Sequence, residues 1–324
     1  MAAASTPGAA RHVPVLLERI VELLAPALVV PGARYVDGTL GMGGHSEAIL
    51  QACPNAHLIG IDRDPQALSL AKQRLAPFGD RVELYHATYH ELPEVLEEAG
   101  VRRVQAICLD LGLSSLQIDD TQRGFAYATD APLDMRMNPE QELTAADIVN
   151  TWTAAELARI LRTYAEERFA ARIADAIVAA RQEHRFTSSA ALVAVISDAI
   201  PMAARRTGGH PAKRTFQALR IAVNAELESL VGVLPAALEA LAPAGRLAVL
   251  AYHSGEDRLV KRAFAEVSRD RVPAGVPAVP AGYAAGYRLL TRGAERPSDD
   301  EIARNPRAAS ARLRAIIRDQ EVSR

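Results

Sequence analysis

Short apolar runs and longer periodic segments alternate along the first third of the chain. The apolar runs lie at residues 34–37, 58–62, 82–86 and 104–109, and the periodic segments lie between them at residues 45–52, 65–75 and 92–99. Short runs bounded by polar residues are typical of buried strands, and the longer periodic segments are typical of helices. This order predicts a parallel sheet with helices on its faces.

The pattern changes in the middle of the chain and then returns. Residues 117–150 are irregular and contain several Asp, Gly and Pro, whereas residues 153–199 are Ala-rich and helical in pattern. The remaining segments predict a helix, a turn, a strand, a helix, a loop and an edge strand, at residues 224–241, 242–245, 246–252, 256–267, 273–286 and 311–318.

The simplest organisation is one α/β domain that is interrupted by a helical insertion. We expect residues 1–11 to form a flexible tail. Residues 12–116 and 221–324 would form the α/β domain, and residues 117–220 would form the inserted helical domain. Phe216 lies at helical spacing within the insertion, which predicts a core position for its ring.

Composition places the chain among globular proteins. The 324 residues are 49% hydrophobic and 23% charged, and the longest apolar run, at residues 190–196, is far shorter than the ~20 residues that cross a bilayer. The N-terminus lacks the basic and apolar parts of a signal peptide. Two cysteines are too few for a disulfide scaffold or a four-thiolate zinc site. We expect a cytoplasmic protein without membrane spans or a metal, and its state as monomer or homodimer stays open.

The charge is unevenly distributed, although the net charge is only −2. Residues 151–220 carry eleven Lys and Arg against six Asp and Glu. Five cations without an intervening acid fall at Arg205, Arg206, Lys213, Arg214 and Arg220. This run predicts contacts to the phosphates of a nucleic acid, and a solvated helix face is the alternative.

A glycine-rich turn follows the first predicted strand. Residues 37–45 contain Gly41, Gly43 and Gly44 directly before a helical segment. Glycines permit a sharp turn and close approach of a ligand, so a nucleotide-like ligand is expected. Asp62 ends the second strand, where a carboxylate can accept hydrogen bonds from a ribose, and Asp110 ends the fourth strand at the same edge of the sheet. The alternatives are a tight turn without a ligand and a helix cap at this point, a role for which Asp64 is better placed.

Two classes of cofactor compete for this turn. A dinucleotide site favours glycine where this chain has Ser46. Asp37 precedes the turn, and its carboxylate would attract the amino group and sulfonium of S-adenosylmethionine but repel a pyrophosphate. The turn therefore favours a methyltransferase, and a nicotinamide-dependent oxidoreductase and a non-catalytic RNA-binding factor remain the alternatives.

Seven motifs in order resemble the bacterial MraW family. They lie at residues 37–46, 110–115, 123–125, 132–137, 164–168, 214–220 and 253–258. Members of this family are S-adenosylmethionine-dependent methyltransferases that act on the N4 amine of a decoding-centre cytidine in 16S ribosomal RNA of the small subunit. The resemblance, which covers residues 12–318, implies a Rossmann-like class I methyltransferase fold with a mostly parallel seven-stranded sheet.

The resemblance also implies which residues hold the cofactor. Gly43, Gly44 and His45 would line its methionine end. The rest of the site would comprise Asp62 at the ribose, Tyr89 at the adenine, Asp110 and Gln117. Asp37 and Gly41 are added to these cofactor residues from the glycine turn itself. Two positions differ from the usual family pattern: Gly255 replaces leucine and Leu116 replaces proline, which affects the local shape of two loops.

The chemistry of N4 methylation indicates a hydrogen-bond acceptor beside the amine, because the amine lone pair is delocalised into the cytosine ring. Asp110 or a backbone carbonyl of residues 110–115 would supply it, with Ser114 in the same loop. His253 would contact the target base, or the segment would cap the following helix through Ser254 and Asp257.

Methylation at cytosine C5 would instead need a reactive cysteine. Cys108 lies within a predicted strand and Cys53 lies at a helix end, and neither has an activating neighbour in sequence. Asp134 and Arg136 are expected to form an ion pair that braces the loop over the site. Amine methylation is thus the consistent reaction.

Overall fold

The computed structural model describes residues 13–205, 209–270 and 284–320. The predicted tail at residues 1–11, Arg206 and most of the predicted loop at residues 273–286 lie outside these ranges. The described residues form one seven-stranded sheet in the order β3-β2-β1-β4-β5-β7-β6. Its strands are β1 Ala33–Asp37, β2 Ala56–Asp62, β3 Val82–His86, β4 Val104–Asp110, β5 Leu241–Ala251, β6 Tyr287–Leu289 and β7 Arg312–Arg318.

The sheet is mostly parallel, as predicted. β3, β2, β1, β4 and β5 are parallel neighbours, and β7 pairs antiparallel with both β5 and β6. The prediction that the last strand lies at an edge is wrong, because the short strand β6 covers its outer side. Residues 242–245, predicted as a turn before the strand, belong to β5 itself as an irregular stretch, since the pairing with β4 passes from Leu241 directly to Arg246.

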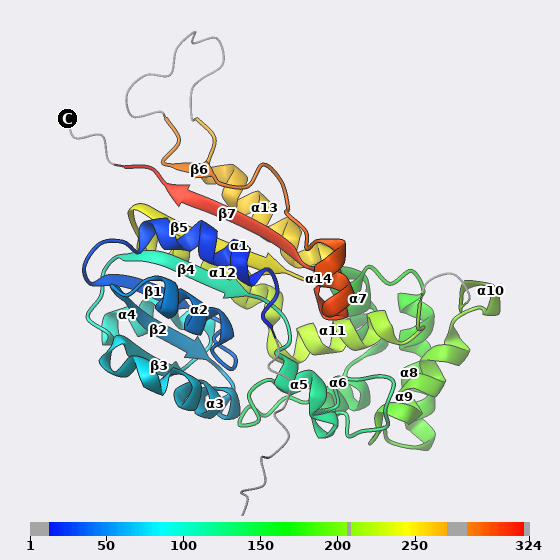
Figure 1. Cartoon of the computed structure of the whole chain (residues 1–324). Coiled ribbons are helices and arrows are strands. Elements are labelled where there is room, and N and C mark those ends of the chain that lie inside the picture. The colour runs from blue at the N-terminus through cyan, green and yellow to red at the C-terminus, as the bar shows by residue number, and fades with distance from the viewer. Residues whose placement is uncertain (1–12, 206–208, 271–283, 321–324) are drawn as a thin grey trace, which may run out of the picture.

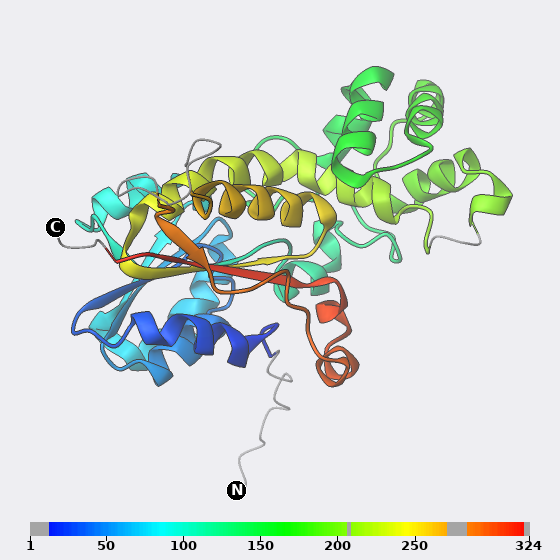
Figure 2. The same ribbon diagram turned by 90° about the horizontal axis from the view of Figure 1, so that it is seen from above.

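Helices cover both faces of the sheet (Figures 1 and 2). The first face carries α1 Leu17–Leu24, α2 Gly44–Ala52 and α3 Pro65–Leu75, and the second carries α4 Leu92–Glu98, α12 Glu226–Ala240 and α13 Ser254–Val267. Neighbouring strand residues alternate between these layers: Tyr35 packs with the first and Val36 with the second. Helix α1, strand β6 and the late helix α14 Asp299–Arg304 have no counterpart among the elements predicted from the sequence.

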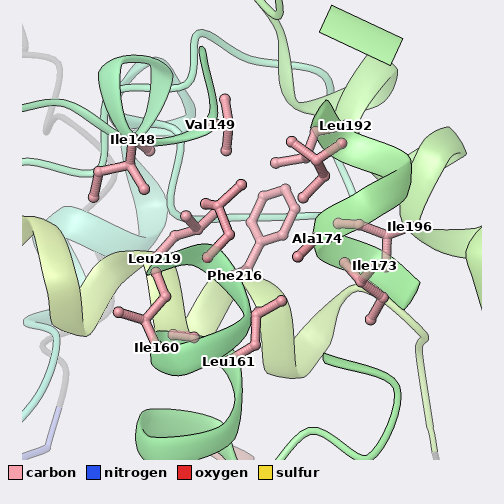
Figure 3. Close-up of a cluster of buried hydrophobic side chains, with 14 of the residues drawn as sticks. Ile148, Val149, Ile160, Leu161, Ile173, Ala174, Leu192, Ile196, Phe216 and Leu219 are labelled. Carbon is pink, nitrogen blue, oxygen red and sulfur yellow. The ribbon is translucent and has the colours of Figure 1, made fainter. Parts of the chain in front are cut away.

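The chain between β4 and α12 is helical. Its helices are α5 Ser115–Asp119, α6 Ala145–Thr151, α7 Ala154–Ala165, α8 Ala170–Glu183, α9 Ser189–Ala199, α10 Met202–Arg205 and α11 Lys213–Asn224, with a 3-10 turn, η4, at Thr121–Arg123. Helices α6 to α9 and α11 share one apolar cluster, in which Phe216 is surrounded by aliphatic side chains (Figure 3). Phe216 is 3% exposed, so the predicted core position is confirmed. We call α6 to α9 and α11, together with this cluster, the helical layer.

The helical layer joins the sheet through a bend between α11 and α12. Ala225 separates the two helices with a φ of 47°, and their axes differ by 56°. Asn224 fixes this joint, because its side-chain amide donates to the carbonyls of Met135 and Arg220 and accepts from the Met137 amide. No single helix among the described ranges is long and apolar enough to cross a membrane, and α11 and α12 meet those criteria only as a bent pair.

Replacing Phe216 with Ala should destabilise the helical layer by about 3–5 kcal/mol, because it removes a buried ring and leaves a cavity. The only tryptophan, Trp152, packs against the same cluster, so its fluorescence reports on this layer during urea unfolding. Replacing Phe78, which packs against the apolar core on the α1 side of the sheet, provides the matched control. An unchanged Trp152 transition in Phe216→Ala would contradict the packing described here.

Candidate cofactor and substrate site

A cavity of about 260 Å³ opens at the carboxyl ends of β1, β2 and β4. This edge of a parallel sheet is where ligands bind in open α/β folds. The cavity extends from the glycine turn after β1 to the joint between α11 and α12. Its wall includes Gly38, Thr39, Gly41, Gly44, His45, Asp62, Arg63, Tyr89, Asp110, Ser114, Gln117, Met137, Arg220, Glu226, Tyr252 and Glu256.

The glycine turn is built as its sequence predicts. Gly41 adopts a φ of 53°, and Gly43 a φ of 77°, which favour glycine. A Cβ on Gly44 would stand 2.5 Å from Pro14 Cγ. Gly43 faces Leu75 of α3 and lies outside the cavity wall.

Asp37 supports the turn from beneath. Its carboxylate accepts a hydrogen bond of 2.7 Å from Ser46 Oγ, and burial raises its pKa. Asp37 is 2% exposed and does not line the cavity, so the structure does not bring it to the ligand side of the turn. Ser46, which stands where a dinucleotide site favours glycine, is thus the hydrogen-bond donor to the Asp37 carboxylate.

Asp62 lies in the cavity wall at the end of β2. Its two oxygens accept hydrogen bonds from the backbone amides of Gly41, at 2.6 Å, and Asp64, at 2.8 Å. Burial raises its pKa to about 6. Each oxygen retains a lone pair, so the carboxylate can also accept hydrogen bonds from a diol.

Asp110 is anchored on two sides at the end of β4. Its backbone amide donates to Thr39 Oγ1 at 2.6 Å, and its Oδ1 accepts from the Tyr252 hydroxyl at 2.8 Å. Its Oδ2 lies 3.7 Å from His45 Nδ1. Burial raises the pKa of Asp110, while His45 and Tyr252 oppose that rise. The anchoring hydroxyl of Tyr252 could not be assigned from the sequence, because Tyr252 follows the end of β5 and lies 142 positions from Asp110.

His45 closes the methionine end predicted for the cofactor. Its Nε2 lies 3.0 Å from the carbonyl of Val15. Because a carbonyl only accepts hydrogen bonds, Nε2 is the protonated nitrogen. Pro14 and Val15 thereby become part of the cavity wall, which the sequence analysis did not predict.

The loop after β4 is held by a buried carboxylate, Asp64. Ser114 caps α5 and exchanges hydrogen bonds with Gln117. The side-chain Nε2 of Gln117 donates to the Asp64 carboxylate at 3.2 Å. Both terminal nitrogens of Arg123 donate to the same carboxylate, at 2.6 and 3.0 Å. Asp64 also caps α3 through the Gln66 amide, which confirms the predicted cap. Ser114 and Gln117 both line the cavity.

A second ion pair shapes the segment beside this loop. Arg136 donates to Asp134 through two nitrogens, at 2.8 and 2.7 Å, which confirms the predicted pair. Arg136 also donates to the carbonyls of Pro139 and Gln141.

His253 is the N-cap of α13 rather than a residue of the cavity wall. Its Nδ1 accepts from the Gly255 amide at 3.2 Å, and Glu256 accepts from the backbone amides of Tyr252 and His253. The predicted cap through Ser254 and Asp257 is therefore wrong by one residue. Asp257 instead pairs with Arg314 and Arg312 of β7. The cysteines are buried, and burial raises the pKa of Cys108, which agrees with its predicted core position.

The predicted basic run does not form one surface. Lys213 and Arg214 are exposed at the start of α11, and Arg214 donates to the carbonyl of Glu166. Arg205 donates to the carbonyl of Ile200. Arg220 lies in the cavity wall, where it pairs with Glu226, so its prediction as a surface phosphate contact is corrected. Arg220 lies about two helical turns beyond Lys213 along α11, which places it near the joint.

Tyr89 lies between the cofactor side of the cavity and the joint. Its hydroxyl donates to the backbone carbonyl of Glu226 at 3.0 Å, and burial raises its pKa. The Arg63 guanidinium lies 5.7 Å from the ring centre and donates to the carbonyl of Asn224. Arg63, Glu226 and Tyr252 are wall residues that the sequence analysis missed, and only Arg63, which follows Asp62 directly, had a positional signal.

The cavity suits S-adenosylmethionine. Its glycine side leaves backbone close to the ligand space, Asp62 offers acceptors for two hydroxyls, and Tyr89 contributes an aromatic ring to the same wall. The carboxylates of Asp62 and Asp110 favour a cation over a pyrophosphate. In the part of the chain that the structure describes, no group of three His, Cys, Asp or Glu is arranged to hold a metal ion.

Comparison with known proteins identifies the family. Residues 9–319 match the MraW methylase family. Ribosomal RNA small subunit methyltransferase H of Thermobifida fusca is 59% identical over 310 residues, which cover 96% of this chain and 94% of that protein. The enzyme of the same name from Saccharopolyspora erythraea is 60% identical over 311 residues, with 96% and 94% covered. A solved methyltransferase from Streptococcus mutans, in complex with SAH, is 12% identical and has a TM-score of 0.44, with 95% and 99% covered. The chain belongs to the MraW methylase family and uses S-adenosylmethionine as its methyl donor.

Proposed function

We propose that this protein methylates the N4 amine of a decoding-centre cytidine in 16S ribosomal RNA, giving N4-methylcytidine and S-adenosylhomocysteine. The names of its curated relatives support the small subunit as the substrate. The observation that carries the proposed reaction is the Asp110 carboxylate in the wall of the cofactor cavity, which accepts a hydrogen bond from Tyr252 while Thr39 holds the Asp110 backbone amide.

The donor, when bound, supplies a methyl group on a sulfonium to an aligned nucleophile. The protein's task is to make the cytosine amine nucleophilic and to accept its proton. An acceptor beside the amine draws an N–H bond toward itself and localises the nitrogen lone pair. Asp110 Oδ1 is occupied by Tyr252, so Oδ2 faces the amine in this proposal. Backbone carbonyls of residues 110–115 are the alternative acceptors.

The other residues of the cavity wall bind the methyl donor in this proposal. We assign Asp62 to the ribose hydroxyls, Tyr89 to the adenine, and Gly44, His45 and Gln117 to the remaining contacts. Ser114 shapes the loop through its cap. Alignment of the reacting atoms by such fixed contacts can itself lower the barrier by several kcal/mol.

The helical layer is assigned to the RNA. A base must leave its stack to reach the cavity, so the flanking backbone needs to be held. Lys213 and Arg214 are exposed at the end of α11 that lies away from the joint. We assign residues 117–220 to RNA recognition, with these two cations as phosphate contacts.

The reaction is tested with small-subunit particles from a strain that lacks the enzyme. Transfer of a tritiated methyl group followed by nucleoside analysis should yield N4-methylcytidine at one site. Asp110→Asn should lower kcat at least 100-fold, because general acid-base assistance contributes about 10²–10⁴. The exposed Asp80→Asn, in the 3-10 turn Ala76–Arg81 before β3, serves as the control variant. Full turnover by Asp110→Asn would remove Asp110 from this role.

Donor affinity should depend on pH through Asp62. Its carboxylate has a raised pKa of about 6, so it is ionised at pH 7 and mostly protonated at pH 5. Protonation removes the negative charge and an acceptor, so the affinity for S-adenosylmethionine should fall about tenfold from pH 7 to pH 5. Calorimetry checks this, with melting temperatures at each pH to verify folding. Asp62→Asn should bind more weakly at pH 7 and show a flatter profile; an equally steep profile would assign the titration to another group.

Phosphate contact by Lys213 should appear in the salt dependence of RNA binding. Lys213→Ala should weaken binding to small-subunit RNA and reduce the slope of log K against log salt by about 1. Lys72→Ala, on the exposed side of α3, is the control and should leave the slope unchanged. Identical slopes for the Lys213→Ala and wild-type proteins would place the RNA elsewhere.

A further inference from the structure

Arg220 and Glu226 form an ion pair in the wall of the cavity that contains Asp110. Arg220 lies in the last turns of α11, close to the joint, and Glu226 is the first residue of α12. Arg220 Nε and Nη2 donate to Glu226 Oε1 and Oε2, both at 2.8 Å. The side chains are only 16% and 6% exposed, and both line the cavity.

The pair retains hydrogen-bonding capacity. Arg220 Nη1 has no hydrogen-bond partner among the described residues. Among the same residues, the buried side-chain atoms without a partner are Thr215 Oγ1, Arg246 Nε and His253 Nε2, so Arg220 Nη1 is accessible from the cavity. Each oxygen of Glu226 keeps a second lone pair after accepting from Arg220. The pair therefore presents acceptors beside donors, held in one plane by the two parallel hydrogen bonds.

This arrangement complements one nucleobase edge. Cytosine carries an amine donor at N4 next to acceptors at N3 and O2, and guanine pairs with it by presenting an acceptor followed by donors. The Glu226 carboxylate followed by the Arg220 guanidinium has the same order. Uracil carries an acceptor at position 4, which a carboxylate repels.

We propose that the Arg220–Glu226 pair recognises the Watson–Crick edge of the target cytosine, with Glu226 accepting from the N4 amine and Arg220 donating to N3 and O2. This rests on the proposed function. The amine has two hydrogens: Glu226 takes the one on the N3 side, and the one on the C5 side is left for Asp110. The two acceptors together hold the amine and exclude a base without it.

A purely structural role for the pair would be to brace the bend between α11 and α12. The bend already has its own support, because Asn224 bonds to Met135 and Met137 and Arg63 bonds to the carbonyl of Asn224. Tyr89 contacts the backbone carbonyl of Glu226, which a side-chain substitution leaves in place. The two roles therefore predict different results.

The test compares Glu226→Gln with wild type on two kinds of small subunit. One kind carries the target cytidine and gives KM and kcat; the other carries uridine there and gives an inhibition constant. Wild type should favour the cytidine subunits, and Glu226→Gln should lose about tenfold or more of that preference, because a glutamine amide can also donate to uracil O4. Glu228→Gln, an exposed position on the same helix that bonds to Tyr164, is the matched control.

Folding and donor binding are measured on the same variants. Glu226→Gln should remain folded, as its melting curve checks, and should keep its calorimetric affinity for S-adenosylmethionine. Arg220→Lys keeps the charge without the planar fork, and it should raise KM for cytidine subunits about tenfold. It also provides a second reading if Glu226→Gln does not fold.

The outcomes separate cleanly. Loss of base preference with intact donor binding supports the proposal. An unchanged preference in both variants overturns it, as does an equal loss of donor affinity and of both RNA affinities, which is what a brace predicts. A wild-type enzyme that methylates no cytidine N4 would contradict the proposed function itself, and this result is visible before any variant is made.

Discussion

The site depends on one buried carboxylate, that of Asp64. It is fully buried and accepts from the Gln66 amide, the Gln117 side chain and two nitrogens of Arg123. An ionised carboxylate out of water is very costly unless its oxygens are fully hydrogen-bonded, so these partners have little freedom to move. The Asp64 amide in turn holds Asp62, and Arg123 also donates to the carbonyl of Met137. One charge thus ties together the edge of the sheet, the loop after β4 and the approach to the helical layer.

The helical layer is positioned by backbone groups as much as by its apolar core. Asn224 connects the end of α11 to the loop that carries Met135 and Met137, and Arg63 connects the same point to the end of β2. These contacts set the wall opposite the glycine turn. The distance across the cavity is therefore fixed by short polar links from the sheet, while the apolar cluster in the layer fixes the arrangement of its own helices.

The parts of the site that follow from local sequence were predictable. Gly41 and Asp62 act within a few residues of strand ends, and the direction of parallel strands alone places Asp62 and Asp110 at one edge. Asp64 was recognised as a cap because Pro65 follows it. Local pattern also identified the core position of Phe216.

Other assignments needed the packing of distant segments. Arg220 belongs to a basic run in sequence, but the bend at Ala225 turns it toward Glu226 and the cavity. His253 caps its helix with a ring nitrogen, a role that the spacing of Ser254 and Asp257 obscured. Tyr252 reaches the site from the residue after β5 and Val15 from the first described residues, and no short-range pattern encodes these contacts.

The contact between the two ends of the chain has a consequence for synthesis. Val15, which completes the cavity wall beside His45, is followed by Leu16, whose amide donates to Glu301 at 2.7 Å, and Arg19 pairs with Glu295. The residues that anchor this early segment therefore leave the ribosome hundreds of positions after it. The wall of the ligand cavity beside His45 therefore depends on contacts of very high sequence separation, whose loop-closure entropy must be paid before they contribute to stability.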